Sequence, residues 1–291
     1  MWTEVASGVI LGLTVAGLLY LREIFTVPDY KRERIDVSPG NPKDVVHLYV
    51  FPPTCPRPLL NSSNACARLL MFLDLCQIPH EVHTTADVST APKGKLPYIK
   101  HGDRVLPDSK YILKYLLATY GTGKPMLGRL QIQLDEDEQL RHMLLDSLVD
   151  QSLYHDALYS RWLNPSISER NAFRDAALAS VPPLLRAPLF RMICAGMARW
   201  LWGYGLLRYS HEDIAEMAIE HIDAAEAMLR NRTYVHGETP SISDCWLFPA
   251  VNGFLHVRFD SLGVRQHLID ACPNLMHYHN NLAKLLELHE N

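Results

Sequence analysis

The sequence lacks the cysteine patterns that identify a disulfide framework or a redox dithiol. Its six cysteines include no C-x-x-C pair and no metal-ligand spacing. In a chain of 291 residues, they are typical of free thiols in a reducing compartment. A strong charge of either sign is also missing, because 28 basic residues face 32 acidic ones and the formal net charge is −4. This balance, with basic residues dispersed along the chain, argues against a nucleic-acid-binding surface.

The 14 histidines are scattered, and His277 and His279 form the one tight pair in the sequence. On a helix those two side chains point in different directions, which argues against a shared ion. We therefore expect no metal in this protein. The length is sufficient for two domains with a large core.

The chain begins with an uncharged apolar segment at residues 5–21, VASGVILGLTVAGLLYL. It lacks the basic n-region and the cleavage site of a signal peptide, and it is just long enough to cross a bilayer as a helix. Basic residues follow it closely, which by the positive-inside tendency places the rest of the chain in the cytosol. We therefore predict a single-pass membrane protein, anchored by residues 1–22 and joined to its globular part by a linker at residues 23–44. The mitochondrial outer membrane or another endomembrane is the expected location.

Residues 93–109 are typical of two short strands joined by a turn and followed by a helix. Pro97 stands at the start of the first strand, a position that indicates an edge, a bulge or a cis bond. One interpretation is an ordinary hairpin that enters a helix. The other is that a cis Pro97 exposes the backbone of Leu96 to an extended peptide ligand. Asp108 and Ser109, at the helix start, would then bind the charged end of that ligand.

The segments before this stretch predict a thioredoxin-like domain over residues 45–122. Residues 45–51 are typical of a buried strand, and Ser62, Ser63 or Asn64 caps a helix that reaches about Gln77. A second strand is expected at residues 81–84. The resulting order of strand, helix, strand, linker, strand, strand and helix is that of a thioredoxin-like layer.

Residues 123–291 are predicted to be helical almost throughout. Ser241 and Asp244 form a capping box in which the serine hydroxyl accepts the Asp244 amide and the carboxylate accepts the Ser241 amide. Because this box serves folding, we assign Asp244 a structural role. The apolar run at residues 182–208 is interrupted by arginines, so we expect an amphipathic core or dimer helix there.

Several motifs resemble those of glutathione transferases. The L-P-Y-I, turn, strand and D-S order of residues 96–109 is similar to their thioredoxin-like domain, and S-I-S-D at 241–244 is similar to the box before their central C-terminal helix. Residues 154–162, residues 202–214, K-G-K-L-P-Y at 93–98 and P-N-L-x-x-Y at 273–278 resemble the failed-axon-connections family and its cadmium-responsive nematode relatives. Metaxins share this fold. The resemblance covers roughly residues 45–285. It implies an α/β thioredoxin-like domain, an all-helical C-terminal domain and a homodimer.

This resemblance also implies a site. Glutathione would lie along Leu96 and Pro97, with its γ-glutamyl end on Asp108 and Ser109. Ser63 or Cys55 would meet its sulfur, although Ser63 can also be read as a simple helix cap. An electrophile would enter from the helical half, where the expected lining residues are Tyr154, Tyr159, Arg161 and Trp162. The expected activity is thiol addition to an electrophile, and the expected ligand is glutathione without a metal.

A second function stays open at this point. The family's helix-opening S-P-x-C is S-N-A-C at residues 63–66, and a proline-rich loop precedes it. Both departures favour a non-catalytic, metaxin-like scaffold or interaction protein at a cytosol-facing organelle membrane. A role in metal stress, which the cadmium-responsive relatives suggest, has no clustered cysteines to support it.

Overall fold

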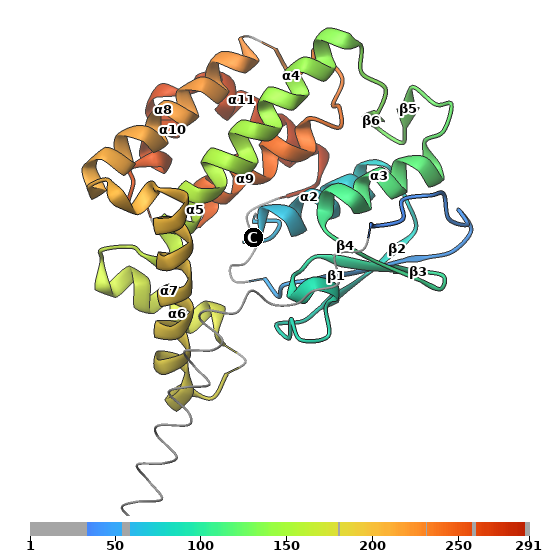
Figure 1. Ribbon diagram of the computed structural model, residues 1–291. Coiled ribbons are helices and arrows are strands. Elements are labelled where there is room, and N and C mark those ends of the chain that lie inside the picture. Colours follow the sequence, from blue (N-terminus) through green and yellow to red (C-terminus); the bar gives the residue numbers. More distant parts are fainter. Residues whose placement is uncertain (1–33, 54–58, 180, 231, 258–259, 289–291) are drawn as a thin grey trace, which may run out of the picture. The chain divides into compact units, whose positions relative to one another are not determined.

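The structure is a computed structural model that describes residues 34–53, 59–179, 181–230, 232–257 and 260–288. The chain divides into two compact units, residues 1–35 and residues 36–291. The fold below is that of the second unit. Its elements carry the labels of Figure 1.

A four-stranded sheet forms the first half of this unit, in the order β2-β1-β3-β4. Its strands are β1 (Val46–Val50), β2 (His80–Thr84), β3 (Tyr98–His101) and β4 (Arg104–Pro107). β1 runs parallel to β2 and antiparallel to β3, and β3 pairs antiparallel with β4. Val46, Leu48 and Val50 alternate toward one face and are buried. This alternation confirms the predicted buried strand.

Two helices cover that face of the sheet, α2 (Asn64–Leu75) and α3 (Ser109–Tyr120), as Figure 1 shows. Residues 85–97, all of them described, contain one short 3₁₀ turn, η1 (Pro92–Gly94), between β2 and β3. The Leu96–Pro97 peptide bond is cis. The predicted thioredoxin-like order is therefore confirmed.

The second half is helical, as predicted. A short hairpin, β5 (Met126–Leu127) and β6 (Leu130–Gln131), leads into it. The helical elements are α4 (Glu136–Ser147), a π-helical segment η2 (Leu148–Leu153), α5 (Tyr154–Trp162), α6 (Ile167–Ala177), α7 (Pro183–Tyr204), η3 (Leu206–Arg208), α8 (His211–Leu229), α9 (Asp244–His256), α10 (Val264–Ala271) and α11 (Pro273–Leu285). The boundary that we predict at residue 122 stays a prediction.

α9 is the buried centre of the helical half, and it contacts α2 across the two halves. Asp244, fully buried at its start, accepts hydrogen bonds from the Ser241 amide at 2.6 Å, the Ser241 hydroxyl at 2.9 Å and the Val235 amide at 3.0 Å. The hydroxyl thus donates to the carboxylate, whereas the predicted box has it accepting the Asp244 amide. That amide instead donates to the Ser241 carbonyl at 3.0 Å. The contacts agree with a structural role for Asp244.

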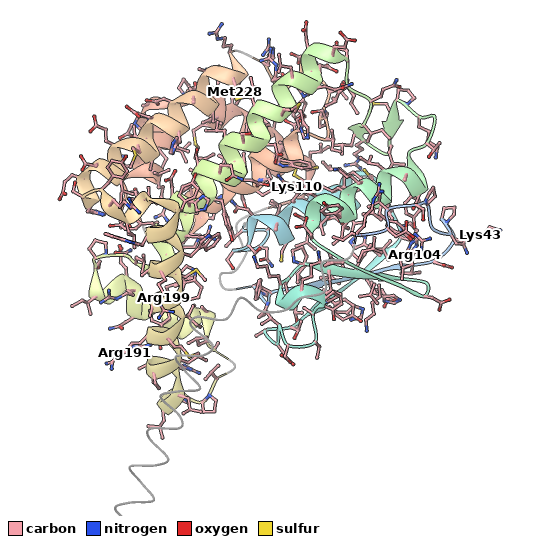
Figure 2. The ribbon with its side chains drawn as sticks, viewed as in Figure 1. Lys43, Arg104, Lys110, Arg191, Arg199 and Met228 are labelled. Carbon is pink, nitrogen blue, oxygen red and sulfur yellow. The ribbon has the colours of Figure 1, made fainter. Side chains whose placement is uncertain are left out.

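The predicted transmembrane helix and membrane location need a correction. Within the described residues, no helix combines the length and the apolar character needed to cross a bilayer. The longest of the described helices, α7, has Arg186, Arg191 and Arg199 along it, and Figure 2 labels the last two. This finding contradicts the single-pass location, which we withdraw. The apolar segment at residues 5–21 lies outside the described residues, as does the linker up to residue 33.

Candidate active site

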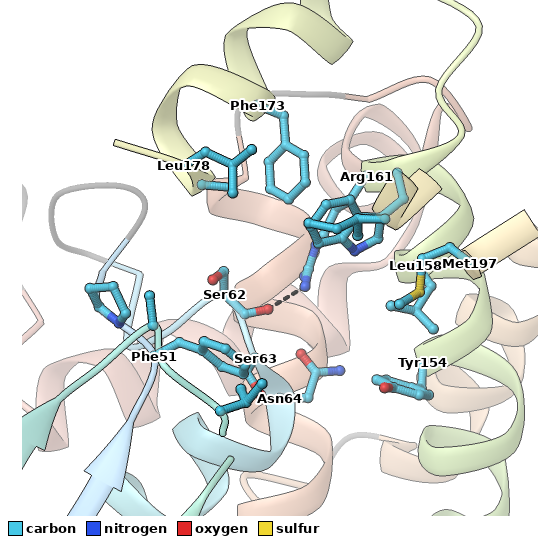
Figure 3. Close-up of a pocket in the computed structure, with 16 residues that line it drawn as sticks. Phe51, Ser62, Ser63, Asn64, Tyr154, Leu158, Arg161, Phe173, Leu178 and Met197 are labelled. Carbon is cyan, nitrogen blue, oxygen red and sulfur yellow. Dashed lines mark hydrogen bonds between the residues drawn. The ribbon is translucent and has the colours of Figure 1, made fainter. Parts of the chain in front are cut away.

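A pocket of about 450 Å³ lies where the two halves of the fold meet (Figure 3). The end of β1 and the start of α2 form one wall, and helices α5, α6 and α7 form the others. Most of its lining is apolar, including Phe51, Leu158, Trp162, Phe173, Leu178 and Met197. The lining residues, all within the described chain, include no histidine, cysteine or carboxylate, so a metal ion has no ligand set here. The space suits an apolar small molecule.

Ser63 lies in the wall of this pocket and also caps α2. Its Oγ accepts a long hydrogen bond of 3.4 Å from the Cys66 amide. The Ser63 amide in turn donates to Oδ1 of Asn61 at 2.9 Å, which fixes the backbone there. Because a hydroxyl both accepts and donates, Ser63 can cap the helix and still offer its hydrogen to a ligand. The two interpretations of this residue are therefore compatible.

Asn64, the first residue of α2, was expected only as a possible helix cap, but it is also a polar residue of the pocket. It lines the pocket and is only 5% exposed. Neither its amide nitrogen nor its amide oxygen has a hydrogen-bond partner within the described chain. Leaving such a group unpaired costs about 1–3 kcal/mol. Because Asn64 lines the pocket, its unpaired side-chain amide is positioned to bind a polar atom of a ligand.

Arg161 of α5 ties the helical half to the loop before α2. Its Nη1 donates a hydrogen bond to the backbone oxygen of Ser62, drawn as a dashed line in Figure 3. A Cβ on Gly253 of α9 would lie 3.1 Å from Nη2 of Arg161 and 3.4 Å from Oδ1 of Asn64. A side chain on α9 would therefore crowd both groups. The guanidinium and the N-terminus of α2 together make this end of the pocket electropositive, which favours an anion such as a thiolate.

Three of the four residues predicted to line the electrophile's entry line the pocket, namely Tyr154, Arg161 and Trp162. Burial raises the pKa of the Tyr154 hydroxyl, against an opposing effect of Arg161, so this group stays protonated at neutral pH. Tyr159 is outside the lining, and its hydroxyl contacts Nδ1 of His211 at 3.0 Å. The difference follows from helical geometry, because residues 154, 158, 161 and 162 share one face of α5 and residue 159 does not.

The cysteines near α2 differ in what can be said of them. Cys55 lies outside the described residues. Cys66 is fully buried, and that burial raises the pKa of its thiol to about 11. It is therefore an inert core thiol.

Leu96, Pro97, Asp108 and Ser109 meet at the junction of β3, β4 and α3 but are not among the residues that line the pocket. Oδ1 of Asp108 caps α3 by accepting the Lys110 amide at 3.0 Å, and the Asp108 side chain is exposed. The Ser109 hydroxyl is buried and accepts a hydrogen bond from Nη1 of Arg68 at 3.4 Å.

Arg68 belongs to an ion-pair network that links the two halves. It pairs with both carboxylate oxygens of Asp150, at 2.6 and 3.3 Å, and stacks 4.2 Å above the Trp246 ring. Lys110 bridges Asp150 and Asp146 at 3.1 and 2.8 Å. Burial alone would raise the pKa of Asp150, but Arg68 and Lys110 outweigh that effect and hold it below its usual value. Both carboxylate oxygens of Asp150 are thus engaged inside the fold.

Comparison with known proteins agrees with this architecture. Residues 64–167 match the family model of the glutathione S-transferase N-terminal domain. The isoprene-epoxide–glutathione S-transferase of Rhodococcus sp. (strain AD45) is 25% identical over 230 residues, which cover 76% of this chain and 91% of that protein.

Solved structures show the same fold at low sequence identity. The β-etherase LigF of Sphingobium sp. strain SYK-6 is 16% identical with a TM-score of 0.55, over 84% of this chain and 98% of that one. A glutathione S-transferase III in its apo form is 14% identical with a TM-score of 0.51, over 82% and 91%. The chain is therefore a glutathione S-transferase-like protein, with a thioredoxin-like N-terminal half and a helical C-terminal half.

Proposed function

We propose that this protein binds glutathione and joins its sulfur to an apolar electrophile. The observation that carries the proposal is the start of α2, where the Ser63 hydroxyl and the unpartnered Asn64 side-chain amide line a mostly apolar pocket. Polar donors at a helix N-terminus stabilise a thiolate, and apolar walls hold an apolar co-substrate beside it. The similarity to a transferase named for isoprene epoxide and glutathione supports the same reaction class.

The residues have the following roles in this proposal. The glutathione thiol loses its proton to solvent, and the thiolate accepts hydrogen bonds from Ser63 and Asn64. Leu96 and Pro97 hold the peptide backbone. Asp108 and Ser109 hold the γ-glutamyl end, where the Asp108 carboxylate keeps lone pairs beyond the one that caps α3.

The electrophile lies among the apolar side chains of α5, α6 and α7. With an epoxide, the sulfur forms a bond to one ring carbon, the bond from that carbon to oxygen breaks, and the oxygen takes a proton from solvent. In this proposal Tyr154, protonated and in the pocket wall, donates a hydrogen bond to that oxygen. Holding both reactants in one pocket lowers the entropic part of the barrier. Cys55 as a sulfur partner, the homodimer and the narrower failed-axon-connections resemblance stay predictions.

Turnover tests the proposal against the scaffold hypothesis. We expect the full chain to conjugate glutathione to apolar epoxides, and Ser63→Ala to lower kcat/KM by about 10-fold or more, since a hydrogen bond to a charged group contributes about 1.5–3 kcal/mol. Ser168→Ala, the same change on α6 away from the pocket lining, is the control. A scaffold has no activity to lose. Absence of turnover by the wild-type chain with both epoxides and activated aryl halides would contradict the proposal.

A further inference from the structure

The face of the sheet opposite α2 and α3 carries a cluster of histidines and a carboxylate. The parallel pairing of β1 with β2 sets His47 beside Glu81, and Tyr49 beside His83. Glu81 and His83 are two residues apart on β2, so their side chains lie on the same face. His47 and His83 are 36 residues apart in the sequence. Strand pairing alone therefore brings the three side chains together.

The three donor atoms have the spacing of metal ligands. Nδ1 of His47 lies 3.2 Å from Nε2 of His83 and 3.3 Å from Oε2 of Glu81. Nε2 of His83 and Oε2 of Glu81, which form the third side of this triangle, are 3.9 Å apart. A tetrahedral zinc ion with bonds of about 2.0–2.1 Å separates its ligand atoms by about 3.3–3.4 Å. Two sides of the triangle match one face of that tetrahedron. The third needs a shift of about 0.5 Å, which a rotation of the exposed Glu81 side chain can supply.

We propose that His47, Glu81 and His83 form a zinc-binding site whose fourth position is open to solvent. Two imidazoles and one carboxylate are a donor set that Zn²⁺ prefers, and three protein ligands leave room for a water or another ligand. The side chains of His47, Glu81 and His83 are 40%, 61% and 40% exposed, so an ion can reach the cluster.

The neighbouring ring of Tyr49 orients one member of the cluster, the His83 imidazole, by stacking on it. It stacks on His83 with centroids 4.8 Å apart and planes at 22°, and on Tyr98 at 4.4 Å and 5°. Stacking orients the His83 imidazole before an ion arrives, which lowers the entropic cost of binding. A second group in the described chain, Asp223, His267 and Cys272, is less suited. Cys272 is fully buried, so an incoming ion reaches its sulfur less readily than it reaches the exposed cluster on the sheet.

The zinc site is separate from the proposed glutathione site. None of His47, Glu81 and His83 lines the apolar pocket. Failure of one proposal therefore leaves the other standing.

Zinc titration of the full chain, with the metal removed beforehand by a chelator, tests the site. We expect one equivalent of Zn²⁺ to bind the wild-type protein, with affinity reduced about 100-fold or more in His47→Ala and in His83→Ala, because second-layer changes alone cost 10–100-fold. His80→Ala is the matched control, since His80 lies on the same strand with its ring toward Ile78 and Asp74. It should bind zinc as the wild type does.

Cobalt substitution provides a second, spectroscopic readout. Co²⁺ in a site with three protein ligands and low coordination number gives strong visible absorption, and adventitious surface cobalt does not. We expect this absorption in the wild type and in His80→Ala, and its loss in Glu81→Gln, a near-isosteric change that preserves the fold. Absence of zinc binding by the wild type, or binding that survives removal of either His47 or His83, would overturn the proposal.

Discussion

Replacing Asn64 with alanine should lower activity without lowering stability. In the absence of ligand the Asn64 amide makes no hydrogen bond within the described chain, so the substitution breaks none. It removes an unpaired buried amide, a benefit of about 1–3 kcal/mol, and leaves a small cavity that offsets part of it. We therefore expect the free energy of unfolding to be unchanged or slightly higher.

The same change removes a proposed donor to the glutathione thiolate. A hydrogen bond to a charged group contributes about 1.5–3 kcal/mol, which corresponds to roughly a 10–150-fold loss in kcat/KM. The assay is steady-state conjugation of an apolar epoxide, paired with urea unfolding of the same protein samples. Most substitutions of buried functional residues lower both kcat/KM and the free energy of unfolding. A loss of activity without a loss of stability would therefore distinguish a ligand-binding role of Asn64 from a role in folding.

Asn171→Ala is the matched control, because it makes the same chemical change on the exposed surface of α6. We expect it to alter kcat/KM by less than twofold and stability by at most about 0.5 kcal/mol. Unchanged activity in Asn64→Ala would show that the amide does not bind the sulfur. Activity and stability that fall together would assign Asn64 to folding alone.

Three further predictions concern the fold. Asp150→Asn should destabilise the chain by about 3 kcal/mol in urea unfolding, because it leaves the buried Arg68 guanidinium without its carboxylate. Asp175→Asn, which changes the more exposed pair with Arg174, should not measurably change the free energy of unfolding. Gly128→Ala should destabilise the chain more than Gly123→Ala does, by at least about 1 kcal/mol. Both glycines have positive φ, but of the two only Gly128 would bring an added Cβ into a clash with a backbone oxygen, that of Leu75. Burial lowers the pKa of the His279 imidazole from 6.5 to about 4. As the pH drops, the unfolded chain therefore protonates this imidazole before the folded chain does. The free energy of unfolding should fall between about pH 6.5 and about pH 4. His279→Gln should reduce the difference between the free energies of unfolding at pH 7 and pH 5 by up to about 2 kcal/mol. A difference that is equal in the variant and the wild type would contradict the lowered pKa of His279.

Local patterns were sufficient to predict the sheet and the first helix. The strand expected at 45–51 is β1 at Val46–Val50, and that expected at 81–84 is β2 at His80–Thr84. Alternating burial and turn residues determine these elements, and both signals lie within a few residues. The π-helical segment Leu148–Leu153 lies between α4 and α5, in a half that the sequence predicts only as helical almost throughout. Packing against α8 and α9 accompanies this segment, and periodicity carries no signal for it.

The pocket lining was predicted in part, with Tyr154, Arg161 and Trp162 expected from the family resemblance and Ser63 from a local signal. Ser63 follows from a helix-capping signal beside a strand end, which a short sequence window contains. The burial of Asn64 depends on α9, whose Gly253 lies far from it in the sequence. The residues next to Asn64 in the sequence therefore carry no signal of this burial. Likewise, the expectation of no metal rested on spacing along the sequence. His47, Glu81 and His83 meet through strand pairing, which spacing does not report.

The most direct measurement is calorimetric titration of the full chain with glutathione and, separately, with S-hexylglutathione. We expect both to bind at one site per chain, with glutathione in the millimolar range or tighter, corresponding to about 4 kcal/mol or more. The hexyl chain should enter the apolar pocket, and burial of even two methylene groups at about 0.8 kcal/mol each gives a tenfold gain in affinity. No heat with either ligand, or equal affinity for the two, would contradict a glutathione site joined to this pocket.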